Sequence, residues 1–287
     1  MSDVKTEAGF RKFLIIWMGE WISNIGTGMT AFGLGVYVWQ LTGSALDVAM
    51  VELAALLPLI LLTPVAGVLA DRYDRRLLMA LGDSISGLGL LLMLLLMMSG
   101  HIQVWQICLC VGFSSAFSSL LDPAYKATLT DLLTEEEYAR ASGMVGIASA
   151  SKFLISPILG GLILAWHSME LILVIDILTL VVTVVAILMV RRSLKTRPTE
   201  KKELDFLRDL KEGWQVIAAS RGVMLLIVLV SVLVFYMGIL QVLARPMLLS
   251  FASEQTTGIL QTVVACGMLV SSMLIGGGLI RKNLVNV

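Results

Sequence analysis

Charge is scarce in this sequence, and its scarcity excludes an ordinary water-soluble protein. Asp, Glu, Lys and Arg make up 15% of the 287 residues, whereas hydrophobic residues make up 57%. The mean hydropathy is +0.90. Soluble domains carry charge on about a quarter of their residues. The composition therefore predicts a protein that resides in a membrane.

Residues that commonly carry out chemistry are also few. The chain has two histidines, His101 and His167, and three cysteines that all fall within apolar runs. It contains no Gly-x-Ser-x-Gly, no His-Glu-x-x-His and no phosphate-binding loop, which are common signatures of enzymes. The cysteines lack zinc-ligand spacing and are interpreted as small core residues. We expect no enzyme, no cofactor, no metal site and no nucleic-acid partner.

What the sequence has in abundance is long apolar runs. Eight of them are long enough, at ~1.5 Å per residue, to cross a ~30 Å hydrocarbon layer as helices. Uninterrupted runs such as 88–98 do not fit the alternating strands of a membrane barrel. The predicted fold class is an all-α polytopic membrane protein with eight transmembrane helices. The predicted spans are about 13–38, 48–70, 77–98, 102–121, 142–165, 169–190, 223–249 and 257–280.

The basic residues predict the orientation of these spans. Nineteen of the 21 Lys and Arg lie at the two termini or after spans two, four and six. The loops after spans one, three, five and seven contain none. Lys and Arg concentrate on the cytoplasmic side of membrane proteins. We therefore expect a multi-pass protein of the cell (plasma or inner) membrane with both termini cytoplasmic.

One charged stretch divides the chain. Residues 1–190 are predicted to form an N-terminal bundle of six transmembrane helices, and residues 223–287 a partial C-terminal bundle of two. Residues 191–222 are predicted to form a cytoplasmic linker. Within it, Phe206, Leu210, Trp214 and Ile217 have the spacing of an amphipathic helix on the membrane surface.

A dense group of charges follows the second span. Five charged residues occur within 67–76, and such a group cannot lie in hydrocarbon, so a tight turn at the membrane surface is predicted. The order of residues resembles the loop signature of the major facilitator superfamily of transporters, except that Asp74 stands where the family usually has Gly. The residues that carry this match are Gly67, Leu69, Ala70, Asp71, Arg72, Arg75 and Arg76.

The resemblance covers essentially the whole chain and points to the branch with macrolide-efflux proteins and the enterobactin exporter. Further matching segments are 40–45, 122–137 and 206–214. It implies a conformational gate formed by Gly67, Asp71, Arg72, Arg75 and Arg76. In the family, the Asp at position 71 caps a helix of the second half, where a carboxylate is stabilised by free N–H groups and the helix dipole. The Arg at position 75 joins a charge network at the inner gate.

The fifth span contains a second match. Gly143, Pro157, Gly160 and Gly161 resemble the antiporter signature of drug exporters. Lys152 and Ser156 stand where that signature has glycines. Small residues allow helices to approach closely, and proline bends a helix. This match favours an exporter over an importer.

Ionisable groups inside the membrane are the candidate site, because each costs several kcal/mol unless it is paired or hydrated. Glu20, Asn24, Lys152 and Asp176 fall well inside predicted spans. A transporter coupled to protons needs a carboxylate that can lose and regain a proton. Proton coupling, substrate contact and structural pairing are all open for Glu20 and Asp176, whereas pairing is the favoured role of Lys152.

Four other charged residues are expected to have different roles. Glu52 lies near the outer interface and is expected to be solvated. Asp83 and Asp122 are expected to pair with the arginine cluster of the 67–76 turn. Arg245 is expected to extend toward the interface with its charge in water.

These observations together predict a secondary active transporter that exports an amphipathic, drug-like solute in exchange for protons by alternating access. The solute would be a macrolide-type antibiotic or a siderophore, and the lipid bilayer the other partner. Because the resemblance implies twelve helices, a C-terminally truncated, transport-inactive membrane protein or scaffold is the alternative. An importer of the same superfamily is a further alternative.

Overall fold

Within the residues described, the chain is built from helices joined by short turns. The structure is a computed structural model, and residues 2–192 and 220–276 of it are described. No strand occurs in these two ranges. The helices are α1 (Ser2–Thr42), α2 (Ala45–Arg72), α3 (Arg75–Met98), α4 (Val104–Ser118), α5 (Leu121–Leu132), α6 (Glu135–Leu154), α7 (Ser156–Trp166), α8 (Met169–Arg192), α10 (Arg221–Leu249) and α11 (Glu254–Gly276).

Six helical segments of the described ranges are long and apolar enough to cross a membrane, which confirms the predicted fold class. Four are the single helices α2, α3, α8 and α10, and two are the consecutive pairs α4–α5 and α6–α7. The first predicted span lies within α1, and α11 covers the last one as far as residue 276. The total of eight spans stays a prediction. The amphipathic helix predicted in the linker lies outside the described residues.

Two predicted spans contain a break. The helix of the fourth span is interrupted at 119–120, and α5 then continues through Asp122. The predicted end of this span at about residue 121 is therefore too early. Pro123 is tolerated in the first turn of α5 because N–H groups there have no partner within the helix. The fifth span changes at Ile155 from α6 to α7, whose first turn holds Pro157, so this proline starts a helix.

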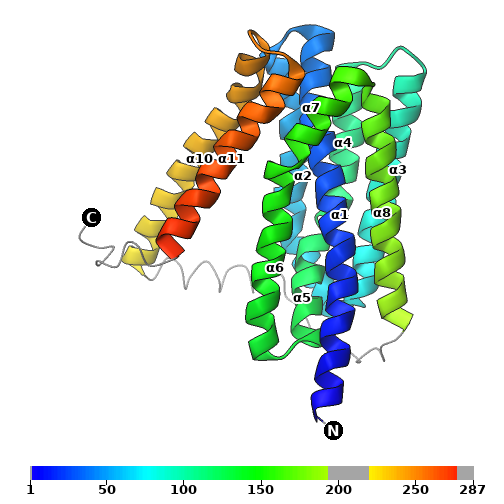
Figure 1. Ribbon diagram of the computed structural model, residues 1–287, viewed down its shortest axis with the longest axis vertical. Helices are drawn as coiled ribbons and strands as arrows, with labels where there is room; N and C mark the ends of the chain where they lie inside the picture. Colours follow the sequence, from blue (N-terminus) through cyan, green and yellow to red (C-terminus); the bar gives the residue numbers. More distant parts are fainter. Residues whose placement is uncertain (1, 193–219, 277–287) are drawn as a thin grey trace.

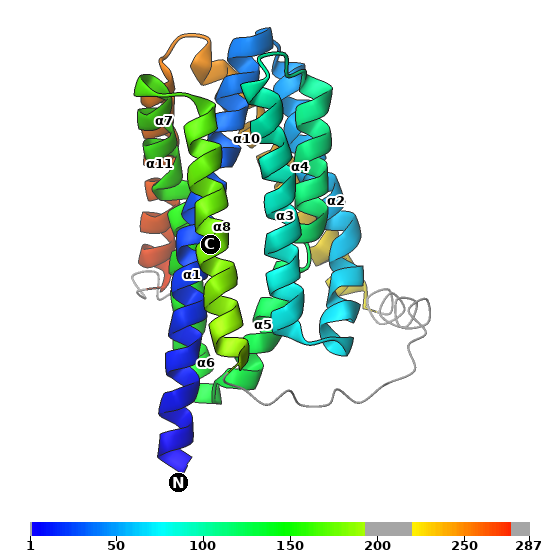
Figure 2. The same cartoon turned by 90° about the vertical axis from the view of Figure 1, so that its right-hand side faces the viewer.

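The turns lie at two ends of the bundle, which we name by a residue of each. The Arg75 end holds the turn at Tyr73 and Asp74 between α2 and α3. The Gly43 end holds turns in which Gly43 (φ 65°) and Gly100 (φ 77°) adopt the left-handed conformation that glycine allows. Figures 1 and 2 show α1, α3 and α8 running between these ends, with α4 beside α3 and α2 beside α4.

Apolar packing holds the bundle together near both ends. Phe13, Met79 and Ile187 belong to a fully buried cluster toward the Arg75 end. Met93 and Ile172 belong to a second cluster toward the Gly43 end. The outward faces of α2 and α10 carry many exposed apolar side chains, as expected for helices bathed in lipid.

The pair α10–α11 contacts the α1–α8 bundle through α7, α6, α1 and α2. Figure 1 shows the pair meeting the bundle at the Gly43 end and diverging from α6 toward the Arg75 end. The contact at the Gly43 end is close because glycines line it. A Cβ atom on Gly161 would lie 2.9 Å from the backbone oxygen of Glu254, and one on Gly258 would collide with the backbone oxygen of Pro157.

The two remaining glycines of the antiporter-like segment differ from each other. A Cβ on Gly160 would lie 3.0 Å from Cδ1 of Phe32 on α1, so this glycine lets α7 approach α1. Gly143 on α6 has open space around it. Only part of the segment therefore serves close helix packing.

Alanine substitution at two of these glycines should change stability in opposite directions. In a helix, Gly→Ala normally stabilises by about 0.5–1 kcal/mol, and Gly143→Ala should do so because its surroundings are open. Gly258→Ala should destabilise by about 1–3 kcal/mol because the added methyl meets a backbone carbonyl that cannot rotate away. Thermal unfolding of the purified protein in detergent measures both. Equal shifts of the same sign would contradict the observed packing.

Candidate functional site

The turn at the Arg75 end is anchored by arginines. Arg75 forms an ion pair with Asp131 of α5 at 2.8 Å and donates hydrogen bonds to the backbone oxygens of Ala127 and Ala70. These contacts tie the start of α3 to α5 and to the end of α2. The participation of Arg75 in a charge network at an inner gate stays a prediction.

Asp74, which stands where the family usually has Gly, connects three elements of the same turn. Its side chain caps the N-terminus of α3 by accepting a hydrogen bond from the backbone N–H of Arg76 at 3.1 Å. It also forms an ion pair with Arg191 at the end of α8 at 2.8 Å. Burial raises the pKa of Asp74, but the hydrogen bonds from Arg191 and from the backbone N–H groups outweigh it and hold the pKa below its ordinary value.

The other gate-motif residues make fewer contacts. Asp71 and Arg72 are exposed, and Asp71 forms no ion pair within the described ranges. Arg76 has a buried Nε atom, and Gly67 has open space around it. The expected capping of a second-half helix by Asp71 stays a prediction.

A cavity of about 440 Å³ lies within the α1–α8 bundle. It is lined by residues of α1, α2, α3, α4, α5, α6 and α8, and members of both apolar clusters, such as Leu90 and Tyr125, form part of its wall. Glu20, Asn24, Lys152 and Asp176 all line it. The structure therefore brings together, from three helices, the four residues predicted for proton coupling or substrate contact, and their roles stay predictions.

The acidic groups of this cavity have few partners. Asp176 is fully buried and accepts a hydrogen bond from Oγ1 of Thr27 through Oδ1 at 3.3 Å. Its Oδ2 is buried without a hydrogen-bond partner within the described part of the chain, as is Oε1 of Glu20. A Cβ on Gly26 would lie 3.0 Å from Oδ1 of Asp176, so α1 can approach this carboxylate only because position 26 is glycine.

Lys152 faces the same cavity without an ion pair to any residue of the described ranges. Asp176 and Glu52 are close enough to attract its charge, but neither is within 4.0 Å. Its side-chain stem packs near Gly28 of α1. The favoured pairing role of Lys152 is therefore not realised as a direct contact.

The prediction that Asp83 and Asp122 pair with the arginine cluster is wrong. Asp83 does not join the arginine cluster but lines the cavity with 2% of its surface exposed, and its Oδ2 has no partner within the described residues. Asp122 forms an ion pair with Lys126 one turn along α5 at 2.7 Å. Asp83 lies in the third turn of α3. Its closeness in sequence to the arginine cluster suggested contact with that cluster, but its side chain faces the cavity.

Hydroxyl groups of α3 and α4 complete the wall near Asp83. Ser86, one turn beyond Asp83, shares a 2.6 Å hydrogen bond with Ser114 and a 3.0 Å hydrogen bond with Ser118. Sequence reasoning overlooked these serines and Tyr125, whose hydroxyl is also buried in the wall of the cavity. The available signal was the i, i+3, i+7 spacing of Asp83, Ser86 and Leu90, which places all three on one face of α3.

An ion pair joins α10 to the bundle beside this cavity. Nη1 of Arg245 contacts Oε1 of Glu52 on α2 at 2.5 Å and donates to the backbone oxygen of Ala31 at 3.3 Å. The guanidinium also lies over the ring of Phe32, 5.8 Å from its centroid. The expectations of a solvated Glu52 and an outward-reaching Arg245 are therefore wrong, because the two charges pair with each other within the protein.

Two further features support this contact. Position 35 of α1 is glycine, and a Cβ there would collide with the Arg245 guanidinium. Nearby at the Gly43 end, Nε2 of Gln40 donates a hydrogen bond to Oε1 of Glu254 on α11 at 2.5 Å. Charge, hydrogen bonding and glycine packing thus all join the α10–α11 pair to the bundle at the same end.

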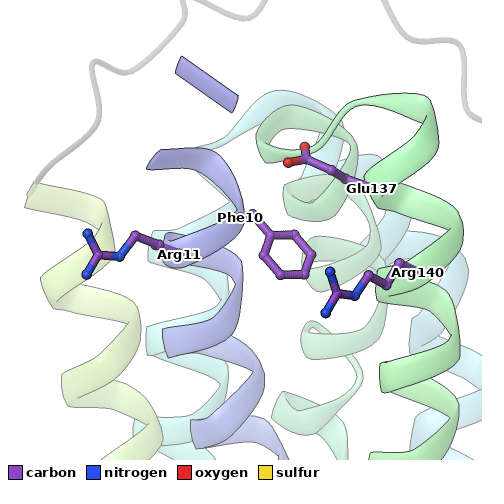
Figure 3. A pocket seen from close by; sticks show the side chains of 4 residues that line it. All are labelled: Phe10, Arg11, Glu137 and Arg140. Atoms are coloured by element: carbon purple, nitrogen blue, oxygen red, sulfur yellow. The ribbon is translucent and has the colours of Figure 1, made fainter. Parts of the chain in front are cut away.

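A second hollow at the Arg75 end does not form a comparable site. It is lined by Phe10, Arg11, Glu137 and Arg140. Figure 3 shows Arg140 directed at the ring of Phe10 and Arg11 directed away from it, so the charged groups do not converge. Glu137 is engaged in a capping box with Thr134 at the start of α6.

The sequence of this chain is similar to one protein family and to several named proteins. Residues 7–284 match the family described as transmembrane secretion effector. Macrolide efflux protein A of Streptococcus pyogenes is 24% identical over 267 residues, which are 92% of this chain and 66% of that protein. The uncharacterized MFS-type transporter YfiS of Bacillus subtilis is 27% identical over 263 residues, 90% of this chain and 60% of its own length. Enterobactin exporter EntS of Shigella flexneri is 28% identical over 168 residues, 58% of this chain and 40% of that protein.

Removal of the Asp74 side chain should destabilise the protein at neutral pH. Asp74→Ala deletes a helix cap and leaves Arg191 without its partner, at a cost of about 1 kcal/mol. Asp71→Ala, at an exposed position of the same turn, should change stability by less than about 0.5 kcal/mol. Denaturation of the purified protein in detergent measures the difference.

The effect of Asp74 should also depend on pH. Because folding lowers the pKa of Asp74, its stabilisation is complete above the ordinary carboxyl pKa of about 3.9 and is lost as pH falls through the lowered value. The stability gap between the wild type and Asp74→Ala should therefore narrow on acidification. A gap that widens toward low pH would contradict the assignment.

A double-mutant cycle should detect the Arg245–Glu52 pair. Arg245→Gln and Glu52→Gln each leave the other charge, 37% exposed at Glu52 and 12% at Arg245, without its partner. The double variant should therefore be less destabilised than the sum, with a coupling energy of about 1 kcal/mol. The exposed pair of Lys126 and Asp122, four residues apart on α5, is the matched control and should couple by about 0.3–0.5 kcal/mol. Additive effects at 52 and 245 would contradict a direct ion pair.

Proposed function

This chain belongs to the transmembrane secretion effector family, within the major facilitator superfamily of transporters, and from that premise we propose that it exports an amphipathic, drug-like solute in exchange for protons. The relatives by name are macrolide efflux proteins and enterobactin exporters. We propose a macrolide-type antibiotic or a siderophore as the solute. The chain spans 60–66% of the length of the first relatives described above, so the activity of a whole transporter enters here as a proposal.

The observation that carries the proposal is the cavity with its buried carboxylates. Glu20, Asp83 and Asp176 come from three helices, and each has a carboxylate oxygen without a partner in the described ranges. Leaving such groups unsatisfied in a membrane interior is costly. A structural core would fill the space with apolar side chains, whereas a transport site needs groups that are satisfied by a solute or by protons.

Proton exchange follows from the placement of Asp176. Its Oδ1 is held by Thr27, and its Oδ2 is free to carry a proton or to contact a solute. In the proposed cycle, a solute entering the cavity displaces the proton on this carboxylate. Protonation from the opposite side of the membrane then releases the solute, which couples export to the proton gradient.

Alternating access is supported by the asymmetric contact of α10–α11 with the bundle. If the basic residues mark the Arg75 end as cytoplasmic, the contacts of Arg245, Gln40, Gly161 and Gly258 lie at the outer end. In that orientation the observed state is closed toward the outside, and the solute enters from the cytoplasm. Transport then requires these contacts to break while the halves rock about the cavity.

Accumulation in an efflux-deficient host tests the proposal. The 287-residue chain is expressed, and the cellular content of a macrolide or a dye is measured with and without an uncoupler. We expect reduced accumulation that the uncoupler restores. An increase in accumulation would indicate an importer, and no change despite good membrane insertion would indicate a transport-inactive protein or scaffold.

Two variants then test the coupling site. Asp176→Asn should abolish the response to the uncoupler, because an amide cannot carry the exchanged proton. Glu136→Gln removes an exposed carboxylate from the first turn of α6 and should leave export unchanged. If Asp176→Asn retains proton-dependent export, Asp176 is not the coupling residue.

A further inference from the structure

We propose that the solute bound in the cavity is an amphipathic cation, such as a protonated amine or an onium ion, and that Asp83 and Asp176 contact its positive charge. This inference rests on the proposed function and selects between the two solute classes named for it. It also assigns a binding role to Asp83, which lies in the wall of the cavity and not at the charged turn.

Most of the ionisable side chains that line the cavity without an ion pair are acidic. Glu52 is neutralised by Arg245 at 2.5 Å, and Asp122 by Lys126 at 2.7 Å. The lining then retains the carboxyl groups of Glu20, Asp83 and Asp176 against the single ammonium group of Lys152. A lining with three acidic groups and one basic group attracts positive charge.

The geometry of the two aspartates fits a ligand contact. The Asp83 side chain comes from α3 and the Asp176 side chain from α8, and they are 2% and 0% exposed. Each has an Oδ2 atom without a partner in the part of the chain described here. Asp83 is close enough to both Asp176 and Glu20 for their negative charges to repel one another. A cation placed among them would relieve this repulsion and satisfy the free oxygens.

An anionic solute gains nothing from the same groups. An ionised carboxylate repels it, and a protonated carboxyl offers one hydrogen bond while the remaining oxygens still repel. Lys152 is the one base left unpaired in the lining, and Asp176 and Glu52 already draw on its charge. A multiply charged anion would therefore enter a site with too little positive charge to hold it.

The rest of the lining indicates that the cation is amphipathic. Leu34, Val51, Leu90, Val111 and Leu180 contribute apolar surface. The hydroxyl groups of Ser86, Ser114 and Ser118 lie on the α3 and α4 side, in line with Asp83 along the helix face. Hydroxyl oxygens accept hydrogen bonds from an ammonium group, and the leucine and valine side chains cover its hydrocarbon part.

Binding of two isosteric ions of opposite charge tests the inference. The purified 287-residue chain in detergent is titrated with radiolabelled tetraphenylphosphonium in a proximity assay that detects only protein-bound label. Unlabelled tetraphenylphosphonium and tetraphenylborate compete for the site. We expect saturable binding of the cation, displacement by the unlabelled cation and no displacement by the anion. Lack of saturable cation binding, or equal displacement by the borate, would overturn the inference.

Substitutions of Asp83 and Asp176 test whether these two residues contact the bound cation. Asp83→Asn and Asp176→Asn should each weaken cation binding by about tenfold or more, because each removes one buried negative charge. Lys152→Gln should bind the cation at least as tightly as the wild type, and Glu136→Gln should bind it equally. Size-exclusion profiles and melting temperatures confirm folding, and Glu20→Gln replaces any aspartate variant that fails to fold. Unchanged binding in both aspartate variants would overturn the assignment.

This assay separates the inference from the proposed function, because binding in detergent requires no transport. Selective cation binding without export in cells would contradict the proposed function alone. Export of an anionic siderophore by a chain that binds no cation would contradict the inference alone.

Discussion

Moving an ionised side chain from water into hydrocarbon costs several kcal/mol, and the described part of this molecule is arranged around that cost. The charges of the turn between α2 and α3 lie at the Arg75 end, where Asp74, Arg75, Asp131 and Arg191 neutralise one another. Arg245 and Glu52 lie deeper and are tolerated as a pair. The remaining intramembrane charges face one cavity. An ionisable group in this bundle is therefore at an end, paired, or in the site.

The same cost explains why close packing and electrostatics occur together where α10–α11 meets the bundle. A guanidinium group reaches Glu52 only because position 35 of α1 has no side chain. Gly161 and Gly258 allow α7 and α11 to approach to backbone contact at the same end of the bundle. Without the glycines the two segments would stand apart, and the charges of Arg245 and Glu52 could not come into contact.

The positions of the membrane helices were predictable from sequence because length and hydropathy depend on local composition alone. Glu20, Lys152 and Asp176 were also predictable as site candidates, because a charge deep in an apolar run is too costly to persist unless it is paired or belongs to a site. Asp83 was misplaced because its distance along the chain from Arg75 says nothing about which side of α3 it faces. Arg245 and Glu52 were misassigned because residues 193 positions apart meet only through tertiary packing. The helix α5 was missed because the charged Asp122 and the following Pro123 resemble the end of a span.

The contact between Arg245 and Glu52 has a consequence for how this end of the molecule can open. Attraction between two charges a few ångströms apart falls about fourfold from the effective dielectric constant of a protein, about 20, to that of water. A first small separation that admits water therefore weakens the force resisting further separation, and drying strengthens it again. Such an ion pair favours either the closed contact or full separation over partly separated arrangements. Its opening is therefore abrupt, and salt promotes it once water has entered, because dissolved ions screen the two charges.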